Sequence, residues 1–142
     1  MKHHVEAVGR NFVLKVAVIA SLLYGANGVV GRIEGRLLPV IESIQIKEIT
    51  YRGGGWSEIS GILTRLRECS FAGLRLEMTN ASGSVMVDYQ FLEPSKIRQH
   101  GPDQFGPWLV QFTEDQVEDM RAIALHRCHT GYLTETTVPF VR

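Results

Sequence analysis

Apolar positions follow two different patterns along the chain. Residues 16–31 carry no charged side chain, and Phe12, Val13 and Leu14 extend this apolar stretch backwards across Lys15, whose long stem can carry its charge to a membrane surface. The 20 residues from 12 to 31 match the roughly 20 residues that a helix needs to cross a hydrocarbon core about 30 Å thick. The sequence therefore predicts a transmembrane helix over residues 12–31, with the lipid bilayer as its partner.

Two other interpretations of this stretch are a cleaved signal sequence and a buried core helix. Cleavage requires small residues just before the cut, and around Ala26 the residue two positions earlier is Tyr24. We therefore favour an uncut anchor. Three basic residues, Lys2, Arg10 and Lys15, precede the uncharged run 16–31, and two, Arg32 and Arg36, follow it; this excess favours a cytoplasmic N-terminus. The prediction is a single-pass inner-membrane protein with a periplasmic C-terminal domain, or a protein of a virion-associated membrane.

After Pro39, apolar residues recur at every second position in short segments, the spacing that puts alternate side chains on one face of a strand. Three glycines at 53–55 predict a turn, and the turn formers at 79–83 predict a β-hairpin. The predicted strands are residues 44–48, 56–63, 74–78, 85–91, 108–112, 121–128 and 134–141. Residues 94–107 are predicted as a long loop, and residues 115–124 fit a short helix as well as a strand.

Seven short strands with regular turn signals are typical of an antiparallel immunoglobulin-like β-sandwich. The predicted class is therefore mainly β, a transmembrane helix followed by such a sandwich. The chain divides into a cytoplasmic tail, anchor and linker at 1–36 and an extracytoplasmic domain at 37–142. At 142 residues it is too short for two independent cores.

Charge is distributed unevenly although the net charge is zero. Residues 1–36 hold five Lys/Arg and two Glu, and residues 37–142 hold ten Lys/Arg and thirteen Asp/Glu. A nucleic-acid-binding domain is expected to be basic, and here the folded part is slightly acidic. The sequence thus argues against nucleic-acid binding, and it carries no phosphate-loop or Gly-x-Gly-x-x-Gly motif for a nucleotide.

Cys69 and Cys128 are the two cysteines of the chain. In an exported domain they are expected to form a disulfide, which would stabilise the fold by about 4 kcal/mol. The alternative is a pair of buried free thiols in a cytoplasmic protein.

Two kinds of chemistry at these cysteines are weighed against the disulfide. A metal site would use His126, Cys128 and His129, completed by Cys69 or His100, but in a strand His129 points to the opposite face and no Cys-x-x-Cys pair exists. A Cys-His nucleophile would need an activated thiolate, which an oxidised Cys128 does not offer. We therefore predict no metal, no cofactor and no catalytic residue.

The segments 101–108 (Gly-Pro-Asp-Gln-Phe-Gly-Pro-Trp) and 126–129 (His-Arg-Cys-His) carry a resemblance. With them, the chain resembles small membrane-anchored proteins encoded by phages and prophages of proteobacteria, over about residues 60–135. In that group an aromatic residue follows the second cysteine closely, as Tyr132 does here. The resemblance implies an envelope-facing or virion-associated role and no particular activity. The candidate binding residues are Phe105, Trp108, His126, His129 and Tyr132.

The function that these features favour is a non-catalytic envelope protein whose β domain binds another protein, or a second copy of itself, through a sheet edge or the 94–107 loop. The alternative is a metal-dependent or thiol hydrolase that uses His126, Cys128 and His129. A third possibility is that the anchor packs against other membrane helices through the small residues at 25, 26, 28 and 31.

Overall fold

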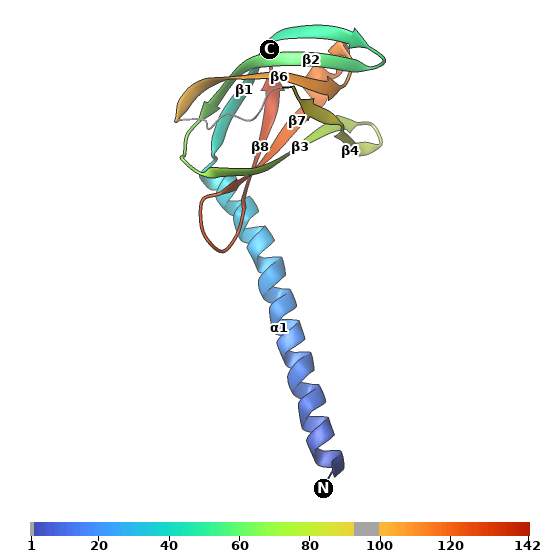
Figure 1. The fold of residues 1–142 in the computed structure, drawn as a ribbon, viewed down its shortest axis with the longest axis vertical. Helices are drawn as coiled ribbons and strands as arrows, with labels where there is room; N and C mark the ends of the chain where they lie inside the picture. Colours follow the sequence, from blue (N-terminus) through green and yellow to red (C-terminus); the bar gives the residue numbers. More distant parts are fainter. Residues whose placement is uncertain (1, 93–99) are drawn as a thin grey trace.

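The computed structural model consists of one long N-terminal helix that carries a β-rich domain at its C-terminal end (Figure 1). It describes residues 2–92 and 100–142, with the side chains of 15–22, 25–92, 100–113 and 116–142. Its elements are α1 (Lys2–Leu37), β1 (Ile41–Gly53), β2 (Trp56–Arg65), β3 (Ser70–Asn80), β4 (Gly83–Val87), β5 (Tyr89–Phe91), β6 (Gly101–Gln111), the 3-10 helix η1 (Glu114–Asp119), β7 (Met120–Arg127) and β8 (Thr134–Val141).

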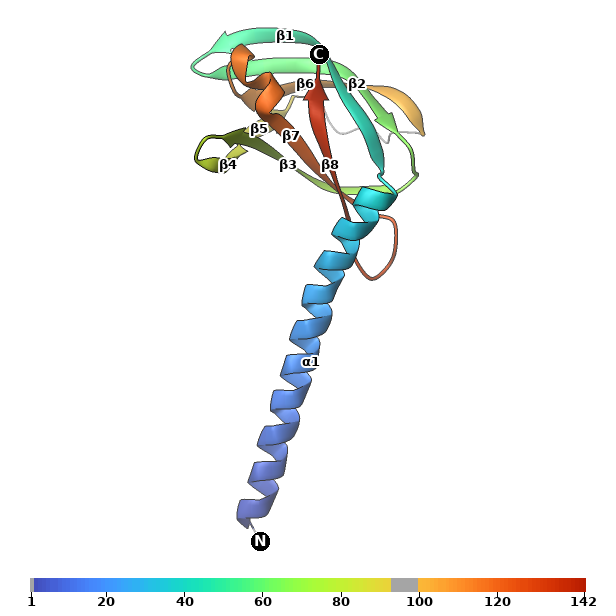
Figure 2. The same ribbon diagram turned by 180° about the vertical axis from the view of Figure 1, so that it is seen from behind.

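Helix α1 includes the whole predicted transmembrane segment and continues beyond it. Its 36 residues make a rod about 54 Å long at 1.5 Å per residue. Within it, Lys15–Leu37 is long and apolar enough to cross a membrane, judged by length and composition. Figures 1 and 2 show that only the last turns of the helix reach the β domain, and that the rest projects away from it.

The described strands form one sheet in the order β4-β3-β7-β8-β1-β2-β6-β5. Strands β4 and β5 lie at opposite ends of this order, yet Asp88 alone separates them in the chain. The two edges of the sheet are therefore brought together, and the Tyr89 hydroxyl on β5 donates a hydrogen bond to the Leu74 carbonyl on β3 at 2.6 Å. The sheet is consequently barrel-like.

The prediction of a mainly β domain after an N-terminal apolar helix is confirmed, but the immunoglobulin-like arrangement is not. The described strands belong to one curved sheet, and β1 pairs with β8 in parallel, with Ile44 opposite Phe140. The other pairs are antiparallel, including the predicted hairpin of β3 and β4, in which Asn80 faces Gly83.

The interior of the sheet is mostly apolar, with polar side chains gathered toward the helix. Period-two patterning supplies the apolar part, because alternate residues of β2 and β8 are buried. Of the buried polar side chains, Ser57 lies at the far end, and Arg65, His126, Thr134 and Thr136 lie at the end that receives the helix, beside the buried Val40 and Ile41. The apolar core is made by residues such as Ile44, Ile46, Ile59, Leu76, Phe105, Trp108, Val110, Met120 and Phe140.

Three sequence predictions are corrected in detail. Much of the predicted 94–107 loop is the first part of β6, and residues 93–99 lie outside the described residues. Pro107 fits into this strand because the register of β2 and β6 shifts between Ile59 and Gly61, so no partner residue opposes it. The predicted strand at 85–91 is two strands that break at Asp88, and in the ambiguous region at 115–124 a 3-10 turn precedes β7.

Candidate functional site: the junction of helix and β domain

The C-terminal turns of α1 dock directly on strand β8. A Cβ atom added to Gly31 would lie 1.9 Å from the carbonyl oxygen of Leu133, and one added to Gly35 would lie 1.8 Å from that of Glu135. Residues four apart lie on one face of a helix, so these two glycines form a smooth surface that lets the backbones touch. Any larger side chain at either position would force the helix away from β8.

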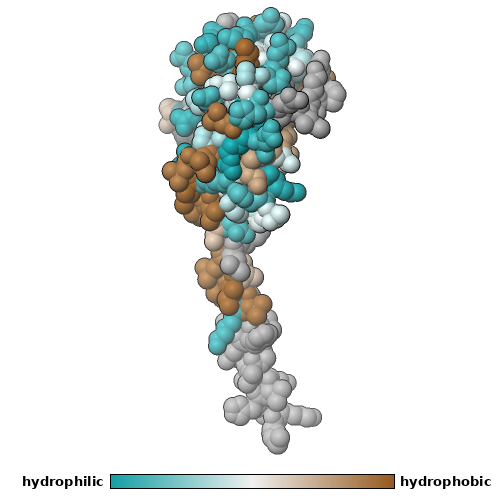
Figure 3. All heavy atoms as spheres, turned by 90° about the vertical axis from the view of Figure 1, so that its left-hand side faces the viewer, coloured by the Kyte–Doolittle hydropathy of each residue, from teal (hydrophilic) through white to brown (hydrophobic). Residues whose placement is uncertain are grey.

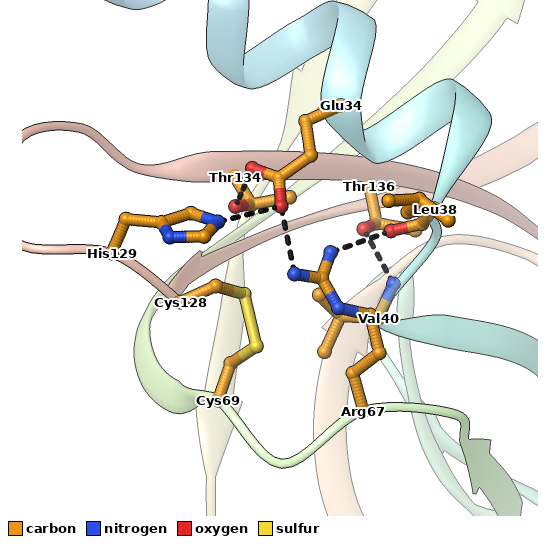
Figure 4. A network of polar contacts seen from close by, with 9 residues as sticks. All are labelled: Glu34, Leu38, Val40, Arg67, Cys69, Cys128, His129, Thr134 and Thr136. Atoms are coloured by element: carbon orange, nitrogen blue, oxygen red, sulfur yellow. Dashed lines mark hydrogen bonds and ion pairs between the residues drawn. A yellow bond between two sulfur atoms is a disulfide. The ribbon is translucent and has the colours of Figure 1, made fainter.

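Glu34, on the same face of the helix, is the centre of a polar cluster (Figure 4). Its Oε2 accepts a hydrogen bond from the Thr134 hydroxyl at 2.7 Å, and its Oε1 lies 2.7 Å from Arg67 Nη2 and 3.0 Å from His129 Nε2. The Glu34 side chain is 11% exposed. We call these four residues the Glu34 cluster.

The cluster also fixes the chain where it leaves the helix. Arg67 uses its second terminal nitrogen, Nη1, to donate to the Leu38 carbonyl at 2.9 Å. The Val40 amide then donates to the Thr136 hydroxyl at 3.2 Å. Arg67 thus binds both the Glu34 side chain and a backbone carbonyl just after the helix, which orients the helix axis relative to β1.

The electrostatics of the cluster favour an ionised Glu34. Burial by itself raises the pKa of this carboxyl group, but the hydrogen bonds from Thr134, Arg67 and His129, together with the charge of Arg67, outweigh burial and lower the pKa from 4.5 to about 2. Because the folded-state pKa is lowered, the carboxylate stabilises the junction fully above pH 4.5, and this contribution is lost as the pH falls toward 2.

The predicted disulfide between Cys69 and Cys128 is confirmed, and it lies beside the cluster. Cys69 follows Arg67 by two residues and Cys128 directly precedes His129. The bridge therefore ties together the two segments that supply these partners of Glu34. The guanidinium of Arg65 adds a hydrogen bond to the Cys69 carbonyl at 2.6 Å.

His126 lies inside the polar end of the barrel and is 2% exposed. Burial, with a smaller effect from the charge of Arg65, lowers the pKa of its imidazole from 6.5 to about 4. Its Nδ1 is buried without a hydrogen-bond partner among the described residues, and its ring packs edge-on against Phe71 at 5.9 Å between centroids. A neutral packing role fits these observations, because the folded protein disfavours the imidazolium form.

A second set of charges lies at the outer side of the junction. Glu135 of β8 is 3.4 Å from Arg32 of the helix and 3.4 Å from Arg75 of β3. The Arg32 side chain is 64% exposed, so this pairing is expected to contribute less than about 1 kcal/mol. In the Glu34 cluster, by contrast, Glu34 and Thr134 are largely buried, so we expect its contacts to contribute more to the docking.

The structure separates the five candidate binding residues into two groups. Phe105 and Trp108 pack against each other in the core, with ring centroids 4.6 Å apart, and His126 is also buried. These three residues present no open surface to a ligand. His129 and Tyr132 lie at the surface beside Glu34, to which the Tyr132 side chain is hydrogen-bonded, and their tilted rings are 5.2 Å apart between centroids. Ligand binding by these two remains a prediction.

Neither chemistry considered for the cysteines fits this site. The sulfur of Cys128 is bonded to that of Cys69, so it offers no thiolate for attack or for a metal. Within the part of the chain that the structure describes, no three His, Cys, Asp or Glu side chains group as metal ligands. The Glu34 cluster and the two glycine contacts join the end of α1 to the barrel-like sheet.

Sequence reasoning missed Glu34, Arg67 and Thr134. Two signals pointed to the docking: the glycines at 31 and 35, four residues apart, and a lone acidic residue between them at the end of an uncharged run. Gly31 had been considered for packing against other membrane helices, but it packs on the protein's own β8. Gly25 and Gly28 have open space around them, so helix–helix packing there remains a prediction.

Comparisons of the chain with protein-family models, with curated proteins and with solved structures give no match.

Proposed function

We propose that this protein is a single-pass membrane-anchored envelope protein whose disulfide-bonded β domain lies outside the cytoplasmic membrane and binds another protein there without catalysis. The observation that carries the proposal is a continuous helix whose described apolar side chains between residues 15 and 30 are exposed and whose last turns dock on the domain. An envelope or virion-associated setting, as the resemblance to phage and prophage proteins implies, belongs to the same proposal.

The exposed apolar side chains of the helix favour a membrane anchor and not the buried core helix of a soluble protein. Only 6% of its most apolar window is buried in the protein, and apolar side chains such as Ile19 and Leu22 are more than half exposed. Figure 3 shows this apolar surface on the helix below a largely hydrophilic domain. A core helix of a soluble protein would be covered, whereas a helix in lipid needs no protein cover.

Continuity of the helix supports an anchor that stays attached. Ala26, near which a signal sequence would be cut, lies inside α1, and the helix runs without a break into the docked turns. The disulfide supports an oxidising compartment for the domain, because such bonds persist outside the cytoplasm. Together with the excess of basic residues before the apolar stretch, this favours a cytoplasmic N-terminus.

Strand β4 supports the binding of a protein partner. It lies at one end of the strand order, and its pairing in the described structure is with β3 alone. Its residues are uncharged, and Val85 and Met86 are exposed. Charged side chains commonly protect an edge strand from pairing with another chain, and β4 has none. An edge strand of this kind can accept an added strand from a partner. The bonded sulfur of Cys128 argues against the alternative of a thiol hydrolase, because Cys128 offers no thiolate.

The anchor is tested by fractionating cells that express the full-length protein. We expect it to stay with the membrane after alkaline carbonate extraction, its domain to be digested by protease added outside the cytoplasmic membrane, and no free thiol to react under denaturing, non-reducing conditions. A soluble cytoplasmic protein with two reactive thiols would disprove the proposal.

The binding surface is tested with a photo-cross-linking amino acid at Met86, and at Gln45 as a matched control. Both side chains are exposed, but Gln45 lies on β1 opposite Ile62 of β2 on one side and Val141 of β8 on the other. We expect a discrete adduct from position 86 in intact cells and none from position 45. Equal labelling at both positions, or none at 86, would contradict binding through the β4 edge.

A further inference from the structure

The loop between β7 and β8, residues 128–133, lies on the side of the domain that faces the N-terminus of the helix. In both Figure 1 and Figure 2 it extends below the rest of the domain, alongside α1. It holds the half-exposed Tyr132 and the exposed Leu133, together with His129. The position of this loop along α1 determines what surrounds it.

The contact with Gly31 gives that position. The Leu133 carbonyl lies directly against Gly31, the last residue of the uncharged run. If residues 12–31 cross a hydrocarbon core of about 30 Å, Gly31 lies at its boundary, and the headgroup region extends about 5–7 Å further. The six helix residues 32–37 rise about 9 Å, so the rest of the junction lies at or just above the headgroups.

The chemistry of the loop suits this environment. Leu133 presents an apolar side chain that is 38% exposed, at the level where hydrocarbon begins. Tyr132 is partly exposed, and because its side chain is hydrogen-bonded to Glu34, it is the aromatic ring that is available to the interface, where tyrosine is enriched. Arg32 and Arg127 are exposed nearby and can pair with lipid phosphates.

We propose that the β7–β8 loop dips into the outer leaflet and contacts lipid headgroups through Tyr132 and Leu133. The domain then rests on the membrane surface and does not stand clear of it. This inference rests on the proposed anchor. Glu34 holds the loop in place, because its carboxylate contacts His129 near the start of the loop and Thr134 directly after its end.

The experiment reconstitutes full-length protein in phosphatidylethanolamine/phosphatidylglycerol vesicles, with or without bromine on the acyl chains near the headgroup. Bromine quenches tryptophan fluorescence at short range, and subtracting the unsubstituted protein removes the signal of Trp56 and Trp108. The test variant is Leu133→Trp. The control is Tyr51→Trp, an exposed position near the β1–β2 turn at the far end of the domain.

We expect brominated lipid to reduce the fluorescence added by Leu133→Trp and to leave that added by Tyr51→Trp unchanged. A third variant, Leu22→Trp, reports on the anchor itself, in vesicles whose bromine lies deep in the acyl chains, because position 22 is near the middle of the span. Quenching at position 22 without quenching at 133 would overturn the loop contact and leave the anchor intact; no quenching at 22 would overturn both proposals. If Leu133→Trp does not fold, Thr130→Trp at the exposed part of the same loop gives the same reading.

Discussion

The two parts of helix α1 differ in what surrounds them. In residues 15–30 every described side chain is exposed, although most are apolar. In residues 31–37, Gly31 and Gly35 are buried against β8, and Glu34 is held by three side chains of the β domain. One unbroken helix therefore changes its environment at Gly31. Substitutions in the two parts should have separable effects, on membrane retention in the first and on domain stability in the second.

The largest effect on the docked part is expected from removing the disulfide. In the double variant Cys69→Ser/Cys128→Ser we expect the free energy of unfolding to fall by about 4 kcal/mol, because a loop of about 60 residues is no longer closed in the unfolded chain. Urea unfolding of the full-length protein in detergent measures this loss. The wild-type protein treated with reductant should unfold like the variant.

Membrane retention of the disulfide variant should be unchanged, since the apolar part of α1 is intact. A variant that unfolds at the same urea concentration as the oxidised wild type would show that the bridge does not constrain the domain.

A charged side chain in residues 15–30 of the helix should weaken membrane retention and leave the stability of the domain unchanged, the reverse of the disulfide variant. Leu22 is near the middle of residues 12–31 and is 68% exposed. Leu22→Arg should make insertion less favourable by about 3 kcal/mol, because a cationic side chain is placed near the centre of the hydrocarbon core. We expect protein to move from the membrane fraction to the soluble or aggregated fraction.

The β domain should tolerate this substitution, since Leu22 contacts nothing in it. Thermal unfolding followed by near-UV circular dichroism in detergent should give the same midpoint for Leu22→Arg and wild type. A lowered midpoint would mean that the free part of the helix stabilises the domain after all.

Adding one methyl group to the helix, in the docked turns or in the exposed part, tests the difference between the two parts with a smaller change. Gly35→Ala would bring its Cβ within 1.8 Å of the Glu135 carbonyl oxygen, so the helix must shift, at a cost of about 1–3 kcal/mol. Gly28→Ala is the matched control, because a Cβ there meets nothing within 4 Å. Limited trypsin digestion should cut Gly35→Ala faster at the arginines of the docked turns, and Gly28→Ala no faster than wild type.

Local patterning in the sequence predicts much of this fold. Leu74 and Leu76 alternate with polar neighbours because one face of β3 covers the core, and the same reasoning finds most of the other strands. The apolar run predicts a helix, and two cysteines predict one bridge. These signals are local, or need only a count of residue types, so a single sequence carries them.

Local patterns do not specify the barrel-like curvature of the sheet or the junction. Pairing of β1 with β8 joins residues almost a hundred positions apart, and no alternation of side chains specifies that partner. The Glu34 cluster is similar, because its hydrogen bonds join residues separated by 33, 95 and 100 positions. Phe105 and Trp108 were proposed as binding residues for a related reason: an aromatic side chain in the sequence does not reveal whether it points inward.

The smallest effect, and the most specific, is expected from Glu34→Gln. Glutamine keeps the shape of the side chain but removes the charge that Arg67 binds, so we expect a loss of about 1–2 kcal/mol at neutral pH. The difference in unfolding free energy between wild type and variant should be constant above pH 4.5 and should shrink as the pH falls toward 2, because wild-type Glu34 then becomes protonated.

His126 provides an internal check on this pH profile. Because the pKa of His126 is lowered in the folded protein, both proteins should lose stability as the pH falls from 6.5 toward 4. In this range the unfolded chain binds a proton at His126 and the folded chain does not. That loss is common to wild type and Glu34→Gln, so it cancels in their difference. A difference that already changes between pH 6.5 and 4.5 would show that a group other than Glu34 contributes to it, and would contradict the assignment to this carboxylate.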